Sequence, residues 1–244
     1  MVSIKSAKKG ALAVSFDAKN ESEVPEKISE ALNYSASRNY SLCYVTVPST
    51  KKYRVEKTEL GMFVGGDEAY NAFSMNLPKI PKEIMEEIYS FFLAVKNYMP
   101  RSNEAAAQIF WDKRKKEYLV YYPKQYVSTV EVDFHRDMFL ENDENFVLVM
   151  DVHSHGIIRP MFSGTDDMDE KGTRLFCVFG NMEDTTMYHF SLRAGTGGHF
   201  IKVNEEEIFD NFFDGMFTNG NVVNPDARRT QKIAEIIAEK VSFR

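Results

Sequence analysis

The chain has 244 residues, 43% of them hydrophobic and 27% charged, which is enough for one sizeable core or for one domain with a smaller appendage. Its formal net charge of -6 provides no overall positive field for a nucleic-acid backbone or an anionic membrane, so we expect neither partner. The sequence has only two cysteines, Cys43 and Cys177, which is too few for a cysteine-rich zinc site. Both lie in apolar runs, and they do not suggest a disulfide scaffold.

The start of the chain has lysines but no apolar stretch long enough for a secretory signal. The most apolar helical stretch, IYSFFLAVKNYM, is interrupted by Lys96 and is too short to span a bilayer. We therefore expect a cytoplasmic protein.

Residues 10–75 contain four short apolar or β-branched runs that are typical of strands: GALAVSF, YSLCYVTV, KKYRVEK and GMFVGG. A helix is expected between the first two, from Pro25 to Tyr34, because proline suits the first turn of a helix. No motif assigns a role to this part of the chain. We treat residues 1–77 as a β-rich N-terminal region of unknown role.

The rest of the chain, residues 78–244, begins with a strong helix signal from Pro81 to Met99, where apolar residues recur at helical spacing. A hairpin is expected next, formed by AAAQIFW and YLVYYP around a charged turn that includes Lys113–Lys116. The nearly continuous apolar run NFVLVMDV predicts a strand buried on both faces.

Three further strands are expected in TRLFCVFGN, MYHFSLRAG and GHFIKVN, with a turn at the glycines of GTGGHF. Two helices should close the chain, one in EEEIFDNFFDGM and one after Pro225, where Ile233, Ile236, Ile237 and Val241 keep helical spacing. This order of elements predicts an α/β domain with a sheet flanked by helices.

The buried strand leads directly into His153-Ser154-His155. Side chains two residues apart in an extended chain point the same way, so the two imidazoles can meet at one point as a pair of zinc ligands. Alone, this pair is a weak signal, because a histidine at the end of a strand is more often hydrogen-bonded to its surroundings. The other histidines, His135, His189 and His199, are isolated in sequence and are expected to be structural.

Seven residues separate His155 from Ser163, and two more separate Ser163 from Asp166. The two residues also fit a helix cap, with Ser163 at the N-cap and Asp166 at the third helical position. The two roles are compatible, because a helix start can hold Asp166 while its carboxylate faces a metal. Two histidines, one carboxylate and a water would give a tetrahedral zinc site with an open position, as in catalytic zinc centres.

The segment HSHGIIRPMFSGTDD resembles the signature of the JAMM/MPN metallopeptidase family, including its prokaryotic JAB branch. This family also has an upstream glutamate before an apolar strand, and Glu104 in SNEAAAQIFWD is the best match. The resemblance covers residues 80–203. It implies a JAB/MPN-like fold, similar to that of cytidine deaminases, with a curved mixed sheet flanked by helices and preceded here by the β-rich extension.

The resemblance implies one zinc ion per chain, held by His153, His155, Asp166 and a water, with Glu104 as general base and Ser163 as a hydrogen-bond donor to the oxyanion. It also implies hydrolysis of the peptide or isopeptide bond after the C-terminus of a ubiquitin-like or sulfur-carrier-like protein. Asp151 and Asp167 lie near these residues in sequence but are not expected to be ligands.

Two alternatives remain beside the active peptidase. The first is a catalytically silent MPN-type scaffold for protein assembly, although such proteins typically lack some of the ligands. The second is a zinc hydrolase that acts on a small amide or a nucleobase, because the JAMM fold resembles that of cytidine deaminases. The deaminase signature of H-x-E followed by P-C-x-x-C is absent, however. The sequence does not indicate an oligomeric state.

Overall fold

The computed structural model describes residues 2–6, 12–38, 42–47, 52–66, 69–98, 102–184, 186–215 and 227–244. Some of the strands and helices predicted from the sequence begin or end outside these ranges, at Gly10, Tyr40, Lys51, Met99, Met216 and Pro225. The chain divides into two compact units, each made of three segments. The first comprises Met1–Pro78, Thr165–Arg174 and Arg193–Val203, and the second comprises Lys79–Gly164, Leu175–Leu192 and Asn204–Arg244.

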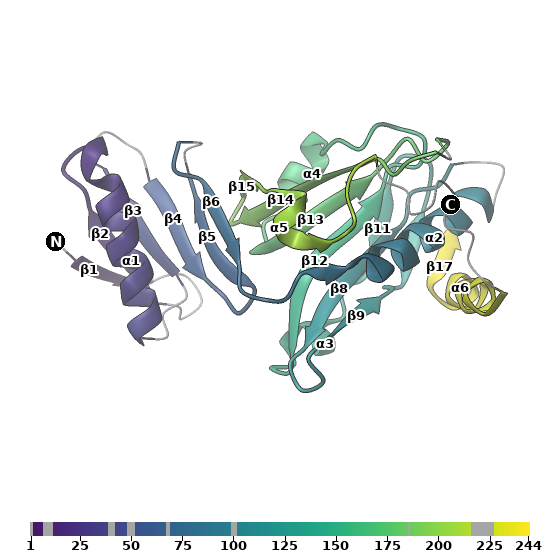
Figure 1. Ribbon diagram of the computed structural model, residues 1–244, viewed down its shortest axis with the longest axis horizontal. Coiled ribbons are helices and arrows are strands. Elements are labelled where there is room, and N and C mark those ends of the chain that lie inside the picture. Colours follow the sequence, from purple (N-terminus) through teal and green to yellow (C-terminus); the bar gives the residue numbers. More distant parts are fainter. Residues whose placement is uncertain are drawn as a thin grey trace. The chain divides into compact units, whose positions relative to one another are not determined.

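The first unit contains a six-stranded sheet in which the strands follow one another in sequence order (Figure 1). Its strands are β1 (Val2–Ser6), β2 (Leu12–Asp17), β3 (Leu42–Thr46), β4 (Lys52–Lys57), β5 (Gly61–Gly65) and β6 (Ala72–Met75). Helix α1 (Val24–Arg38), preceded by the short 3-10 helix η1 (Glu21–Glu23), joins the parallel strands β2 and β3. The four expected strands and the helix are confirmed, whereas β1 and β6 were not predicted.

Alternation of side chains along β3 and β4 explains how this sheet forms a core. Cys43 and Val45 of β3 are buried, as are Tyr53 and Val55 of β4, while the residues between them are half-buried or exposed. The buried set packs with Ala31 of α1 in one hydrophobic cluster. Burial also raises the pKa of the Cys43 thiol, which fits its expected role as a small hydrophobe.

The sheet that carries the histidines follows the order β15-β14-β13-β12-β8-β9. Its strands are β8 (Ala106–Asp112), β9 (Glu117–Tyr121), β12 (Phe146–Ser154), β13 (Arg174–Phe179), β14 (Phe190–Thr196) and β15 (His199–Lys202). Strand β12 is antiparallel to β8 and parallel to β13, so the sheet is mixed and the α/β class is confirmed. The glycine turn between β14 and β15 is also confirmed, since Gly197 and Gly198 have φ angles of 58° and 86°.

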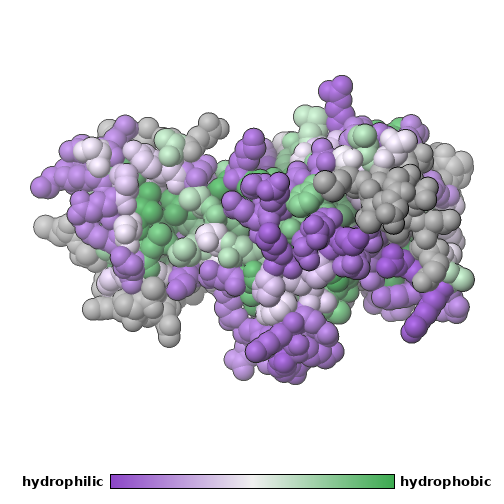
Figure 2. Space-filling view, in the orientation of Figure 1, coloured by the Kyte–Doolittle hydropathy of each residue, from purple (hydrophilic) through white to green (hydrophobic). Residues whose placement is uncertain are grey.

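Helix α2 (Lys82–Tyr98) matches the strong helix signal, and its apolar face is buried. Phe92 of this helix packs against Phe179 at the end of β13. The turn between β8 and β9 is a hydrophilic tip, as expected from its run of basic residues (Figure 2). Among the described residues, no helix is long and apolar enough to cross a membrane.

The smaller elements of the second unit are β7 (Ile80–Pro81), β10 (Gln125–Val127), β11 (Val132–Phe134), α3 (Met138–Asn142), α5 (Glu205–Ile208), β16 (Phe209–Asp210), α6 (Ala227–Lys240) and β17 (Val241–Phe243). Strands β11, β10 and β17 form a three-stranded sheet, and β16 pairs with β7. Helix α4 (Gly164–Asp169) begins directly after Ser163, as predicted.

Of the two helices expected at the end of the chain, the one after Pro225 is confirmed as α6 except for its last residue, and the other is largely wrong. The helix expected in EEEIFDNFFDGM ends at Ile208, because Phe209 instead pairs with Ile80 and Asn211 has a positive φ of 56°. Phe209 and Phe212 are buried in an aromatic cluster with Phe190. Val241, expected in the last helix, begins a strand that pairs with β10.

Candidate metal centre

Strand β12 holds both histidines from its place inside the sheet. The backbone of His153 pairs with Ala106 of β8 on one side and with Val178 of β13 on the other. His155 lies just past the strand, where its N–H donates to the carbonyl of Phe179 over 2.8 Å. Hydrogen bonds to neighbouring strands therefore fix the backbone at both histidines.

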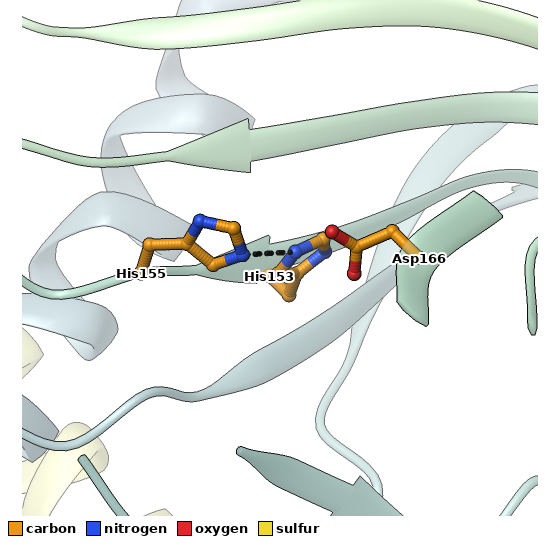
Figure 3. A group of neighbouring side chains, drawn as sticks. All are labelled: His153, His155 and Asp166. Carbon is orange, nitrogen blue, oxygen red and sulfur yellow. Dashed lines mark hydrogen bonds between the residues drawn. The ribbon is translucent and has the colours of Figure 1, made fainter. Parts of the chain in front are cut away.

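The imidazoles of His153 and His155 converge. Their Nε2 atoms lie 3.1 Å apart, and the carboxylate of Asp166, from α4, points toward His153 (Figure 3). One ligand atom from each of the three residues lies within 4.8 Å of those of the other two, and all three residues are half-buried. Within the described ranges, this is the one group of three or more His, Cys, Asp or Glu side chains placed to hold a metal ion.

The set of donor groups and the spacing of the two imidazole nitrogens are compatible with a zinc ion. Two imidazole nitrogens and a carboxylate form a common donor set of catalytic zinc centres. Two ligand atoms that are each about 2.0–2.1 Å from a tetrahedral zinc ion lie roughly 3.3 Å from each other. The observed separation of 3.1 Å between the two nitrogens is close to this value.

The chain turns sharply after His155, and the turn depends on Gly156. Its φ angle is 54°, and a Cβ at this position would lie 2.2 Å from the Oγ of Ser102. The N–H of Ile158 donates to the carbonyl of His155, and the N–H of Met182 donates to the carbonyl of Gly156. Only glycine combines this conformation with this close approach without strain.

Glu104 lies where the chain enters β8, and only 7% of its surface is exposed. Its N–H donates to the carbonyl of Ser128 over 2.8 Å. The antiparallel register pairs Ala106 with His153. The N–H of Ser154 donates to the carbonyl of Ala105, and the N–H of Ala105 donates to the hydroxyl of Ser154. Continued two residues beyond Ala106, this register would put Glu104 opposite His155 and on the same face of the sheet as both histidines.

Ser163 is exposed and lies directly before α4, so Asp166 is the third residue of that helix, as predicted. The capping and oxyanion roles of Ser163 remain predictions.

The two neighbouring carboxylates have other partners. Asp151 accepts hydrogen bonds from Gln108 over 2.8 Å and from Arg136 over 3.2 Å. Asp167 accepts from Arg193 over 2.6 Å. Neither belongs to the group of possible ligands.

The isolated histidines also lie outside this group. The ring of His189 is 2.9 Å from Asp184, and this hydrogen bond contributes most to lowering the pKa of Asp184 to about 2. The backbone N–H of His135 donates to Lys124, and His199 is the first residue of β15.

Sequence reasoning missed three residues that adjoin or contact the segments carrying the candidate ligands: Ser154, Gly156 and Arg193. Gly156 follows His155 directly, and a glycine after the end of a strand is a turn signal that could have identified it. Ser154 and Arg193 act through partners that are distant in sequence, and no local pattern reveals them.

A scan against models of known protein families finds no match, and a search of curated proteins finds no similar sequence. The resemblance to the JAMM/MPN signature therefore depends on the motif.

Proposed function

We propose that this chain is a zinc-dependent metallopeptidase of the JAMM/MPN type. The observation that supports this most strongly is the convergence of His153, His155 and Asp166, whose ligand atoms lie within 4.8 Å of one another. The three residues come from the end of a central strand and from a separate helix. Their spacing in sequence matches the signature of peptidases that use this donor set.

His153, His155 and Asp166 would hold the ion and leave a coordination position open. A zinc ion in such a site supplies a water nucleophile at neutral pH and polarises a carbonyl group.

Glu104 is the general base in this proposal. This role is supported by its N–H, which donates to the carbonyl of Ser128 next to β10, and by the register of β8 and β12, which if continued beyond Ala106 would put it on the face of the histidines. Its carboxylate would accept the proton of the attacking water and deliver it to the leaving amine. Ser163 would donate a hydrogen bond to the substrate carbonyl oxygen as negative charge develops there, and loss of one such donor typically lowers kcat by about 100- to 1000-fold.

The proposed substrate is the bond that follows the C-terminus of a ubiquitin-like or sulfur-carrier-like protein, with the reaction in the cytoplasm. The resemblance supports this substrate class. The alternative is a silent MPN-type scaffold, and the complete set of three ligands and a glutamate favours the active enzyme over it.

The test compares wild type with Glu104→Gln and with Glu117→Gln, which changes an exposed glutamate of β9. Zinc content is measured together with hydrolysis of ubiquitin-like proteins that carry a C-terminal peptide or isopeptide extension. We expect Glu104→Gln to keep zinc and lose hydrolysis, while Glu117→Gln keeps both. Full activity of Glu104→Gln would show that the base is assigned wrongly, and a wild type that binds zinc but cleaves no such extension would contradict the substrate class.

A further inference from the structure

Helix α4 supplies a metal ligand but has little to hold it in place by itself. It has six residues and none of them is buried. Helices this short are unstable in water without tertiary contacts. Its segment also concentrates negative charge, with Asp166, Asp167, Asp169 and Glu170 within five positions.

Arg193 of β14 binds two acidic residues of this segment, one within α4 and one just after it. Its Nη1 lies 2.6 Å from Oδ1 of Asp167, and its Nη2 and Nε lie 2.6 Å and 3.0 Å from Oε2 of Glu170. The N–H of Glu170 in turn donates to the carbonyl of Asp166 over 2.8 Å. The guanidinium group thus bridges Asp167, which follows the proposed ligand Asp166, and Glu170, which lies one helical turn beyond Asp166.

The surroundings of Arg193 keep its guanidinium group in one place. The residue is 9% exposed, and its Cζ lies 3.5 Å from the ring centroid of Phe200. Because the guanidinium group is planar, it can stack on an aromatic ring while it binds two carboxylates. A lysine could supply the charge at this position but could not reproduce this geometry.

We propose that Arg193 is a positioning residue that directs Asp166, rather than Asp167, toward the two histidines. This inference rests on the proposed zinc site. Successive helical residues point about 100° apart around the axis, so only one of the two adjacent carboxylates can face the histidines at a time. By binding Asp167, Arg193 fixes the rotation of α4 and removes the competing ligand.

The experiment measures zinc affinity by competition with a chelator in wild type, Arg193→Met, Arg193→Lys and Arg54→Met. Arg54 is a useful control because it is a half-buried arginine that binds a glutamate, Glu56 of β4, instead of residues of α4. Loss of a group that orients a metal ligand typically weakens metal affinity by about 10- to 100-fold, and this is the effect expected for Arg193→Met. Arg193→Lys should fall between it and wild type, while Arg54→Met should match wild type.

A second readout is the visible absorption spectrum of the Co²⁺-loaded protein, which reports ligand geometry without requiring activity. We expect Arg193→Met to change this spectrum and Arg54→Met to preserve it. If Arg193→Met does not fold, the double variant Asp167→Asn/Glu170→Gln removes both partners while keeping the arginine, and it should show the same loss of affinity.

The outcomes separate this inference from the proposed function. Suppose that wild type binds zinc and that the folded Arg193→Met, or the double variant in its place, binds it equally well. That result would overturn the role of Arg193 alone. Wild type that binds no zinc would overturn the metal site itself.

Discussion

The hydroxyl of Ser154, which lies between the two histidines in sequence, accepts a hydrogen bond from the backbone N–H of Ala105 over 3.0 Å. Ser154 is fully buried, and its own N–H donates to the carbonyl of Ala105 over 2.9 Å. These two bonds hold the start of β8 against the end of β12. Glu104 directly precedes Ala105, so the same contact ties the proposed base to the proposed ligands.

Ser154→Ala should lower the free energy of unfolding by about 1–3 kcal/mol, because it leaves the buried N–H of Ala105 without an acceptor. Chemical denaturation gives this value directly. The matched control is Ser128→Ala, which removes an exposed hydroxyl that bonds to the carbonyl of Glu131. Surface substitutions of this kind usually stay within about 0.5 kcal/mol of wild type. Equal effects of the two substitutions would contradict the importance of the Ser154 contact.

Gly156→Ala should destabilise the protein and weaken zinc binding. The new Cβ would meet Oγ of Ser102 at 2.2 Å, and the φ of 54° is strained for alanine. Left-handed backbone at a residue other than glycine costs about 1 kcal/mol or more, and the clash adds to it. Thermal unfolding and zinc affinity measure the two effects.

Two comparisons separate the clash from the backbone strain. Gly215 also has a positive φ, of 76°, but a Cβ there would meet nothing within 4 Å, so Gly215→Ala should destabilise less. Ser102→Ala combined with Gly156→Ala should recover part of the stability, since it removes the clashing oxygen. If the double variant is no more stable than Gly156→Ala, steric crowding by Ser102 is not the cause.

Asp184→Asn should lose a contribution to stability that depends on pH. The pKa of Asp184 in the folded state is about 2, lowered from 3.8 by hydrogen bonds from His189 and Thr186. Because the folded pKa lies below the unfolded one, the contribution is present above 3.8 and disappears as pH falls toward about 2. The difference in Tm between metal-free wild type and variant should therefore narrow over this range. A difference that stays constant with pH would contradict the pairing.

The sequence predicted the parts of the site that depend on local patterns. The apolar run before His153 indicated a buried strand, and the spacing from Ser163 to Asp166 indicated the helix start that became α4. Both signals are carried by neighbouring residues, so they are readable without knowledge of the fold.

The features that the sequence did not predict depend on contacts between distant residues. The partners of Arg193 lie 26 and 23 positions away, and no local pattern connects them. Phe209 has helical spacing with its neighbours in sequence. It pairs instead with Ile80 of β7, so α5 ends at Ile208. Strands β1 and β6 lie at the edges of their sheet, where short segments pair on one side only.

The most direct test of the metal site is elemental analysis of zinc in wild type and in the double variant His153→Ala/His155→Ala, both purified without added metal or chelator. Three protein ligands with an open position predict about one zinc ion per chain in wild type and none in the variant. Absence of zinc from both proteins, even after zinc is supplied, would contradict the metal centre and favour the silent scaffold.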